Sequence, residues 1–356
     1  LVDVPTVQNQ IFVSDVNKFL FAFGCNNYSE TSIDPMLIRW SDQANIYEWT
    51  PDATNQAGSL RLSHGSEIVA VVQTRQEIVA ITDASIYSIQ YFGPPIVWGA
   101  QLLGDNISIA GPNAAIIASG VVYWMGVDKF YAYDGRVQTL NCDLRRYVFS
   151  DINQDQSAQF FAGTNEGFNE VWWFYCSTTG PDGTGTPTNP NTTVDRYVVY
   201  NYVERVWYYG TLARTAWLDS GLRDYPVAAT YSYNLVNHEQ GLNDQEGATA
   251  TAINAYIASS EFDIGDGHNF GFVWRVLPDL TFSNSLNSPE GAVPQVTMTL
   301  YPLQNSGSGI GKSDADTVKY KAAYTLTNTE QFTGQVYTRV RGRQMIFRME
   351  SDQVNT

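Results

Sequence analysis

Basic residues are scarce in this sequence, and their scarcity argues against one large class of protein. The chain of 356 residues has 20 Lys and Arg against 36 Asp and Glu, a net charge of −16. Proteins that bind nucleic acid tightly need clustered Lys and Arg to displace phosphate counterions. Specific recognition of DNA or RNA is therefore not expected. Solubility is the simplest role for the acidic excess, although an acidic wall would also let DNA slide past without adhering.

Cysteine and long apolar runs are also scarce. The three cysteines, Cys25, Cys142 and Cys176, are far apart, and none lies in a CxxC or Cys–His pattern. This spacing predicts buried free thiols, and neither a zinc site nor a disulfide framework. No apolar run is long enough for a transmembrane helix, and residues 1–10 lack the basic and apolar segments of a signal peptide. We therefore expect no membrane span.

Aromatic residues, in contrast, are abundant, at 13% of the chain. Together with β-branched residues they form short runs bounded by turn residues, a pattern typical of strands. Asp134-Gly135, between two such runs, is a strong hairpin signal. Ile46–Trp49 is among the expected strands. The runs group into five stretches: 18–49, 67–103, 114–140, 159–209 and 227–236.

The spacing of these groups predicts the fold class. Four-stranded units that repeat every 40 to 60 residues or so are typical of propeller blades. We predict an all-β fold, with a β-propeller of four-stranded antiparallel blades in residues 1–250 and a smaller β-sandwich-like domain in residues 251–356. A β-sandwich is the alternative to the propeller. The Gly-, Thr- and Pro-rich segment 177–194 is expected to be a long surface loop within a blade, and 142–150 a short helix.

The smaller domain has its own set of expected strands. They are Ile253–Ser259, Phe272–Val276, Val296–Tyr301, Tyr320–Leu326 and Gln344–Met349.

Several segments imitate binding or catalytic motifs without the context that those motifs need. Residues 306–313 nearly match a P-loop, but a strand-like run follows them instead of a helix, so nucleotide binding is not expected. Asp263–Gly267 lacks the spaced carboxylates and the closing Glu of a calcium loop. His238 and Glu239 are adjacent, so in a strand their side chains would point to opposite faces.

The remaining polar residues form no recognisable catalytic set. His64 and His268 have no second histidine nearby, and no serine lies in a nucleophile elbow. Most carboxylates fall at turns, where Asp is an ordinary hydrogen-bonding residue. We therefore predict that the chain is not an enzyme, with no catalytic residue, no cofactor and no metal.

Arg339, Arg341 and Arg343 stand at alternate positions of a strand-like segment. Side chains at alternate positions of a strand project from the same face. A row of guanidinium groups pairs well with carboxylates of another strand or another subunit. We interpret this row as a candidate subunit-interface ion-pair row, with contact to the DNA backbone as a secondary interpretation.

The motifs of the chain, taken in order, resemble one known family. They are Arg39-Trp40-Ser41, Tyr47-Glu48-Trp49-Thr50-Pro51, Val122-Tyr123-Trp124-Met125-Gly126, Phe130-Tyr131-Ala132-Tyr133-Asp134-Gly135, Glu170-Val171-Trp172-Trp173-Phe174-Tyr175, Glu204-Arg205-Val206-Trp207, His238-Glu239, Phe262-Asp263, Arg275-x-Leu277-Pro278-Asp279 and Arg339-x-Arg341-Gly342-Arg343-Gln344. Each is weak alone, but their order is similar to that of the tail nozzle proteins of short-tailed bacteriophages. These are also called tail tubular protein B-like or packaged-DNA stabilisation proteins.

The resemblance implies a structural virion protein of the phage tail. The chain would form a homo-oligomer, a hexameric ring below the tail adaptor protein, and would offer a platform for tail fibres or spikes. The ring would enclose the DNA exit channel, retain the packaged genome and let it pass during ejection without sequence-specific binding. The chain does not begin with Met, and it stops soon after the Arg-Gly-Arg motif, where the resemblance implies that such proteins continue. Whether segments are missing at either end stays open.

Two other classes of protein stay open at this point. A carbohydrate-acting or carbohydrate-binding β-propeller, a glycosidase or lectin, would have two carboxylates about 5–10 Å apart in a concave pocket. A secreted adhesion propeller would carry glycans on the sequons at Asn27, Asn106 and Asn191.

Overall fold

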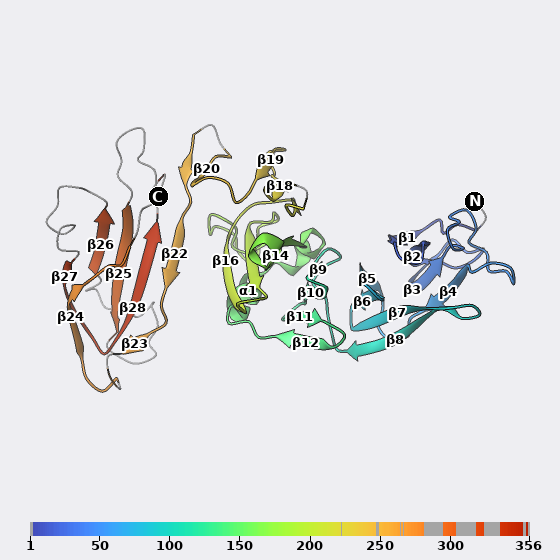
Figure 1. The fold of residues 1–356 in the computed structure, drawn as a ribbon, viewed down its shortest axis with the longest axis horizontal. Helices are drawn as coiled ribbons and strands as arrows, with labels where there is room; N and C mark the ends of the chain where they lie inside the picture. The colour runs from blue at the N-terminus through green and yellow to red at the C-terminus, as the bar shows by residue number, and fades with distance from the viewer. Residues whose placement is uncertain are drawn as a thin grey trace. The chain divides into compact units, whose positions relative to one another are not determined.

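The computed structural model describes residues 3–221, 223–246, 249–263, 265, 267–280, 295–303, 318–323, 335–351 and 354 (Figure 1). The chain divides into two compact units, Leu1–Glu239 and Gln240–Thr356. The division falls at the start of the polar stretch after which the repeating strand pattern of the sequence is lost. Each unit is described by itself.

The described part of the first unit contains four four-stranded antiparallel sheets, each a meander in chain order, and a three-stranded sheet. The first sheet comprises β1 (Gln8–Ser14), β2 (Phe19–Asn26), β3 (Ile33–Trp40) and β4 (Gly58–Arg61), and the second β5 (Ile68–Gln73), β6 (Ile78–Thr82), β7 (Ser85–Gly93) and β8 (Val97–Asp105). The third comprises β9 (Ala115–Ala118), β10 (Val121–Met125), β11 (Phe130–Tyr133) and β12 (Val137–Leu140), and the fourth β13 (Phe161–Asn165), β14 (Glu170–Tyr175), β15 (Arg196–Asn201) and β16 (Val206–Thr211). The three-stranded sheet comprises β17 (Ala216–Leu218), β18 (Val227–Ala229) and β19 (Leu235–Asn237).

Successive sheets contact each other through their first strands, β1 with β5, β5 with β9, β9 with β13 and β13 with β17. This is the arrangement of propeller blades, in which each meander starts at the inner edge. The fold class predicted from the sequence is therefore confirmed. Asp134-Gly135 forms the β11–β12 hairpin turn, where Gly135 adopts φ +106°, a backbone conformation that side chains rarely allow.

The core of this unit lies between the faces of neighbouring blades. β14 is buried along its whole length, because its sheet is covered on both faces. Trp173 of this strand is fully buried, its ring 5.0 Å from that of Phe130 in the third blade. A second apolar cluster joins the first two blades, with Phe21 and Trp98 4.9 Å apart and edge to face.

The predicted loop and helix are also found in this unit. Residues 177–194 connect β14 to β15, which are paired antiparallel, so the loop is a long hairpin connection within the fourth blade. The helix α1 (Arg145–Asp151) overlaps the expected region 142–150 and extends one residue beyond it, and the 3-10 helix η1 (Gln154–Gln159) follows. A second 3-10 helix, η2 (Glu166–Phe168), joins β13 to β14.

The expected strand at Ile46–Trp49 is wrong. This segment is part of the loop between β3 and β4. The Asn45 side chain accepts a hydrogen bond from the backbone N–H of Tyr47 (3.1 Å), and Trp49 donates from its indole to the carbonyl of Ile46 (3.0 Å). These local bonds compete with a strand ladder. Trp49 is nevertheless buried, which explains the apolar pattern of the segment.

The second unit packs two sheets face to face. One has the order β22 (Ala255–Ala258), β28 (Gln344–Ser351), β25 (Gln295–Leu303) and β26 (Val318–Ala323), with β23 (Phe262–Asp263) also paired to β28. The other pairs β24 (Gly271–Val276) with β27 (Val336–Gly342), and a short ladder pairs β20 (Asn243–Asp244) with β21 (Thr251–Ala252). Leu300, Val340 and Met345 form a buried cluster between the two main sheets, as expected for a β-sandwich-like domain.

No helix in the described part of the chain is long and apolar enough to cross a membrane.

Candidate functional site

Two glutamates and an asparagine meet at one end of the fourth blade. Asn165 ends β13 and Glu170 begins β14, and the antiparallel register places them opposite each other. The turn between them is closed by Asn169 in the left-handed region, at φ +60°, which Asn tolerates better than most residues. The Asn165 amide nitrogen lies 3.5 Å from Glu170 Oε2 and 3.4 Å from Glu239 Oε1, so it bridges the two carboxyl groups.

Glu170 is held by donors on its own sheet. Trp172, two residues along the strand and therefore on the same face, donates its indole N–H to Glu170 Oε2 at 2.9 Å. The Tyr208 hydroxyl of β16 donates to the other oxygen, Oε1. Glu170 is only 8% exposed, and hydrogen bonds of this kind are what allow a carboxyl group to be buried.

Stacked aromatic rings continue this face of the blade. The Trp172 ring stacks on Tyr197 at 4.8 Å and on Trp217 of β17 at 5.1 Å. His238 follows β19 and lies 4.7 Å from the Trp217 ring, and its Nε2 accepts a hydrogen bond from Arg214 Nε at 3.0 Å. The site is thus a carboxyl pair beside an aromatic wall, formed where the fourth blade meets the three-stranded sheet.

The environment raises the pKa of both carboxyl groups. Burial is the main cause for Glu170, and the nearby charge of Glu239 adds to it, while the hydrogen bond from Trp172 acts in the opposite direction. Burial alone raises the pKa of Glu239. Glu170 is the more buried of the two residues, since Glu239 is exposed to solvent. A pair of this type can hold a proton at a pH where ordinary glutamates have lost theirs.

The spacing of the pair agrees with acid–base chemistry. Because both are bonded to the Asn165 nitrogen, Glu170 Oε2 and Glu239 Oε1 are at most about 7 Å apart, which does not exceed the separation of paired carboxylates in glycosidases. The same contacts also describe a satisfied buried polar network that holds the blade to its neighbour. The arrangement therefore permits carbohydrate chemistry without requiring it.

We expect ionisation of Glu170 to lower the stability of the first unit as the pH rises. A carboxyl whose folded pKa lies above its unfolded value of about 4.3 binds its proton more tightly when folded, so the free energy of unfolding falls between the two values. The loss is about 1.4 kcal/mol for each pH unit of that window. Glu170→Gln cannot ionise and should remove this part of the pH dependence.

Urea unfolding of both proteins from about pH 4 to about pH 7 measures the difference, because this range begins near the unfolded pKa of Glu. Glu166→Gln, an exposed carboxyl of the same hairpin, is the control and should follow the wild type. Parallel pH profiles for the wild type and Glu170→Gln would contradict the raised pKa.

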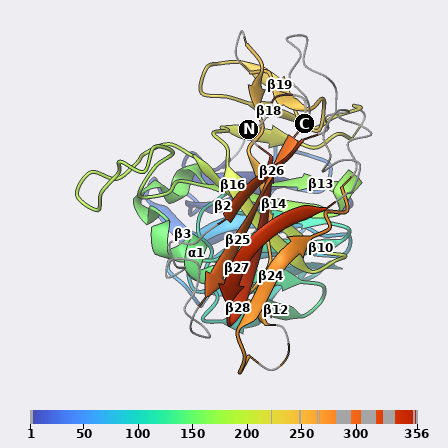
Figure 2. The same cartoon turned by 90° about the vertical axis from the view of Figure 1, so that its left-hand side faces the viewer.

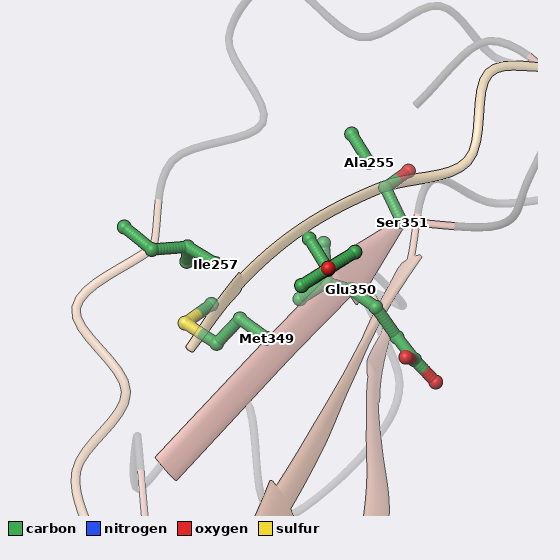
Figure 3. Close-up of a pocket in the computed structure, with 7 residues that line it drawn as sticks. Ala255, Ile257, Met349, Glu350 and Ser351 are labelled. Atoms are coloured by element: carbon green, nitrogen blue, oxygen red, sulfur yellow. The ribbon is translucent and has the colours of Figure 1, made fainter. Parts of the chain in front are cut away.

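The described pocket lies elsewhere, in the second unit. It is a shallow hollow of about 320 Å³ on β22 and β28, lined by Tyr256, Ile257, Met349 and Glu350 among others. Figure 3 shows the Glu350 carboxylate turned away from Met349 and Ile257. That carboxylate pairs with Arg348 at 2.8 Å. The hollow offers apolar contact without converging polar groups.

The three cysteines are free thiols. Cys25 and Cys176 are buried, and Cys142 is half-buried. Burial raises the pKa of Cys25 to about 11 and that of Cys142 and Cys176 to about 12, so all three are poor nucleophiles at neutral pH. Among the described residues, no group of His, Cys, Asp and Glu side chains could hold a metal ion.

The structure describes some of the candidate site residues that were predicted from the sequence, but not all of them. Arg339 and Arg341 project from one face of β27, since both are exposed and Val340 between them is buried, and Arg343 is exposed in the bend that follows the strand. Their role at a subunit interface stays a prediction. The P-loop-like segment 306–313 and parts of Asp263–Gly267 lie outside the described residues.

The sequence did not identify the Glu170–Glu239 pair. His238 and Glu239 are not part of a strand, because β19 ends at Asn237 and both residues lie in the bend after it, so the alternation of a strand does not decide where their side chains point. Asn165 and Glu239 are 74 residues apart and meet only in the folded chain. The one signal in the sequence was the charge of Glu170 beside an otherwise apolar run.

The fold and this site define a class, an all-β protein with propeller blades and a β-sandwich-like domain. No family model matches the chain, and no curated protein does. Similar solved structures include Hsv2 from Kluyveromyces lactis (15% identity, 61% of this chain and 56% of that chain, TM-score 0.33). Another is an exo-beta-1,3-galactanase from Phanerochaete chrysosporium, which is 9% identical in sequence. The match covers 100% of this chain and 96% of the galactanase chain, with a TM-score of 0.34.

Hsv2 from Kluyveromyces marxianus is similar at the same level, with 11% identity over 64% of this chain and 61% of that chain and a TM-score of 0.35. The chain thus spans less than two thirds of the length of either Hsv2 structure. None of the proteins named here is a phage tail protein. Likenesses at this level carry no inference about activity.

Proposed function

We propose that this chain is a structural virion protein of a phage tail, the repeating unit of a ring-shaped nozzle that encloses the DNA exit channel. The observation that carries the proposal is the ordered set of motifs from Arg39 to Gln344, which resembles tail nozzle proteins over most of the chain. The fold supports it, because that family is expected to have a propeller and an added β domain. The acidic composition supports it too, since an acidic channel wall would repel DNA instead of binding it.

The motifs that carry the resemblance belong to the framework of the blades. Val122–Gly126 and Phe130–Gly135 form the β10–β11 hairpin of the third blade and its turns, and Glu170–Tyr175 is the buried strand β14. The same residue types at these positions would preserve the packing between blades. The proposal therefore rests on a shared framework and assigns no catalytic residue.

Light scattering and negative-stain imaging of the purified chain, alone and mixed with a tail adaptor protein, test the proposal. We expect six-fold rings, at least in the presence of the adaptor. Particles that never show ring symmetry under either condition, together with sugar binding by the monomer, would reject the nozzle in favour of the second candidate.

A second candidate function is carbohydrate binding or hydrolysis. It is favoured by one observation, the raised pKa of Glu170 and Glu239 beside the stacked rings of Trp172 and Trp217. Most glycosidases act through a pair of carboxyl groups that flank the scissile bond.

A panel of soluble polysaccharides tests this candidate by affinity electrophoresis and by release of reducing sugar. The carbohydrate function predicts retardation or hydrolysis by the wild type and a loss of hydrolysis of at least about 100-fold in Glu170→Gln, the size expected for one general acid or base. Neither binding nor hydrolysis by the wild type, or activity that both Glu170→Gln and Glu239→Gln retain, would reject it.

A further inference from the structure

The outer face of the β24–β27 sheet is exposed and combines arginines with aromatic rings. Its inner face is fixed by Val273, Val276 and Val340, which pack on the other sheet of the second unit. The side chains of the outer face therefore project into water, and Figure 2 looks onto these two strands. We call this surface the Arg–aromatic face; its exposed residues are Phe272, Trp274, Tyr337, Arg339, Arg341 and Arg343.

The two kinds of side chain alternate across the strands. Phe272 lies directly opposite Arg341 in the antiparallel register. The guanidinium groups of Arg341 and Arg343 lie over the Phe270 ring, 4.8 and 5.3 Å from its centre. Stacking of this type holds a guanidinium in place and leaves its in-plane N–H donors free. The face therefore presents oriented hydrogen-bond donors.

These donors have no carboxylate partner within the described part of the chain. The ion pairs found there involve other basic residues, and none includes Arg339, Arg341 or Arg343. Exposed aromatic rings surround them, with Trp274 53% and Tyr337 66% exposed. Arginine and aromatic residues together are the composition enriched in protein interfaces.

A second copy of this chain carries the complementary charge. The first unit has twice as many acidic as basic side chains. In its first blade Arg39 is buried and Arg61 is paired with Asp34 at 2.6 Å. The loop from β3 to β4 exposes Tyr47 and Asp52, and Glu48 beside them is half-buried, so the loop offers carboxylates beside an aromatic ring.

We propose that the Arg–aromatic face binds this β3–β4 loop on a second copy of the chain. Alternate arginines of a strand are about 7 Å apart, and a planar guanidinium can take a carboxylate through two parallel hydrogen bonds. The contact joins two different surfaces, so it is head to tail and repeats from copy to copy, as a closed ring requires. In this respect it deepens the proposed nozzle and rests on it. Nucleic acid fits less well, because the net charge of −16 opposes its approach.

The test compares charge-reversed variants of the whole chain by light scattering over a range of protein concentrations. R339E/R341E/R343E should weaken self-association at least about tenfold, since like charges then face each other across the contact. The matched control R75E/R136E/R146E makes the same change of net charge at exposed arginines of the first unit and should associate as the wild type does. Far-UV circular dichroism should show all variants folded, because the substituted side chains are exposed.

A charge swap identifies the partner surface. E48R/D52R alone should associate weakly, because its loop and its Arg–aromatic face are both positive. Mixed with R339E/R341E/R343E it should assemble again, since each face then meets a loop of opposite charge, and about 1 M NaCl should weaken this assembly by screening.

Three results would overturn the contact: a wild type that stays monomeric with and without the adaptor, rings that persist in R339E/R341E/R343E, or a mixture that fails to assemble. Persistent rings would leave the nozzle proposal standing and remove only this contact. If the arginine variant loses affinity for a double-stranded oligonucleotide while its self-association is unchanged, the face binds nucleic acid instead.

Discussion

Trp173→Ala is expected to lower the free energy of unfolding of the first unit by about 3–5 kcal/mol, the usual cost of truncating a buried Trp. Trp173 has no exposed surface, and its ring lies between the Phe130 ring at 5.0 Å and the Trp207 ring at 5.9 Å. Its indole N–H donates to the carbonyl of Ala114 at 3.1 Å, which ties the fourth blade to the third. Removing the side chain leaves a cavity, and the Ala114 carbonyl keeps only the hydrogen bond that it accepts from the backbone N–H of Met125 at 3.1 Å.

Chemical denaturation followed by far-UV circular dichroism measures this loss. Trp274→Ala is the matched control, because Trp274 is 53% exposed in the second unit and its truncation should change stability by less than about 1 kcal/mol. The free energy of unfolding of Trp173→Phe should lie between those of Trp173→Ala and Trp274→Ala, since Phe keeps a ring and loses the hydrogen bond. Equal stability of Trp173→Ala and Trp274→Ala would show that the interface between the third and fourth blades is not packed as described.

The blades could be predicted because their signals are local. Asp134-Gly135 predicts a hairpin from two residues alone, and the fully apolar run Val171–Tyr175 predicts a strand covered on both faces. The signals fail where local hydrogen bonds compete with the ladder, as at Ile46–Trp49. They also fail at β1, whose sequence begins with Gln8, Asn9 and Gln10 and lacks an early apolar alternation.

One of the candidate sites could also be predicted from a local signal in the sequence, and the other could not. The common face of Arg339 and Arg341 follows from the two-residue period of a strand, so the sequence predicts it without knowledge of the tertiary fold. The Glu170–Glu239 pair depends on how the three-stranded sheet packs on the fourth blade, and no periodicity encodes that contact. Charge and spacing therefore predict which face a side chain takes, but not which distant residue it meets.

Glu77→Gln is expected to lower the free energy of unfolding at neutral pH by about 2 kcal/mol, a typical cost when hydrogen bonds to a charged group are lost. Glu77 precedes β6 and joins two blades. It accepts hydrogen bonds from Tyr133 of the third blade (2.5 Å), and from Ser88 and Gln90 of its own sheet, the latter at 3.1 Å. Burial alone would raise the pKa of Glu77, but these donors together hold it below its usual value.

The sign of the pH dependence follows from that lowered pKa. A carboxyl with a depressed folded pKa contributes stability above its unfolded pKa of about 4.3, and this contribution is lost as the pH falls through the folded value. The difference in the free energy of unfolding between the wild type and Glu77→Gln should therefore be largest near neutral pH and should disappear below about pH 4. Glu67→Gln makes the same substitution at an exposed position before β5, and its free energy of unfolding should equal that of the wild type. A difference in the free energy of unfolding that stays constant from neutral to acid pH would mean that Glu77 acts through its shape and not through its charge. The hydrogen bond from Tyr133 to Glu77, which joins the third blade to the second, would then not be charge-assisted.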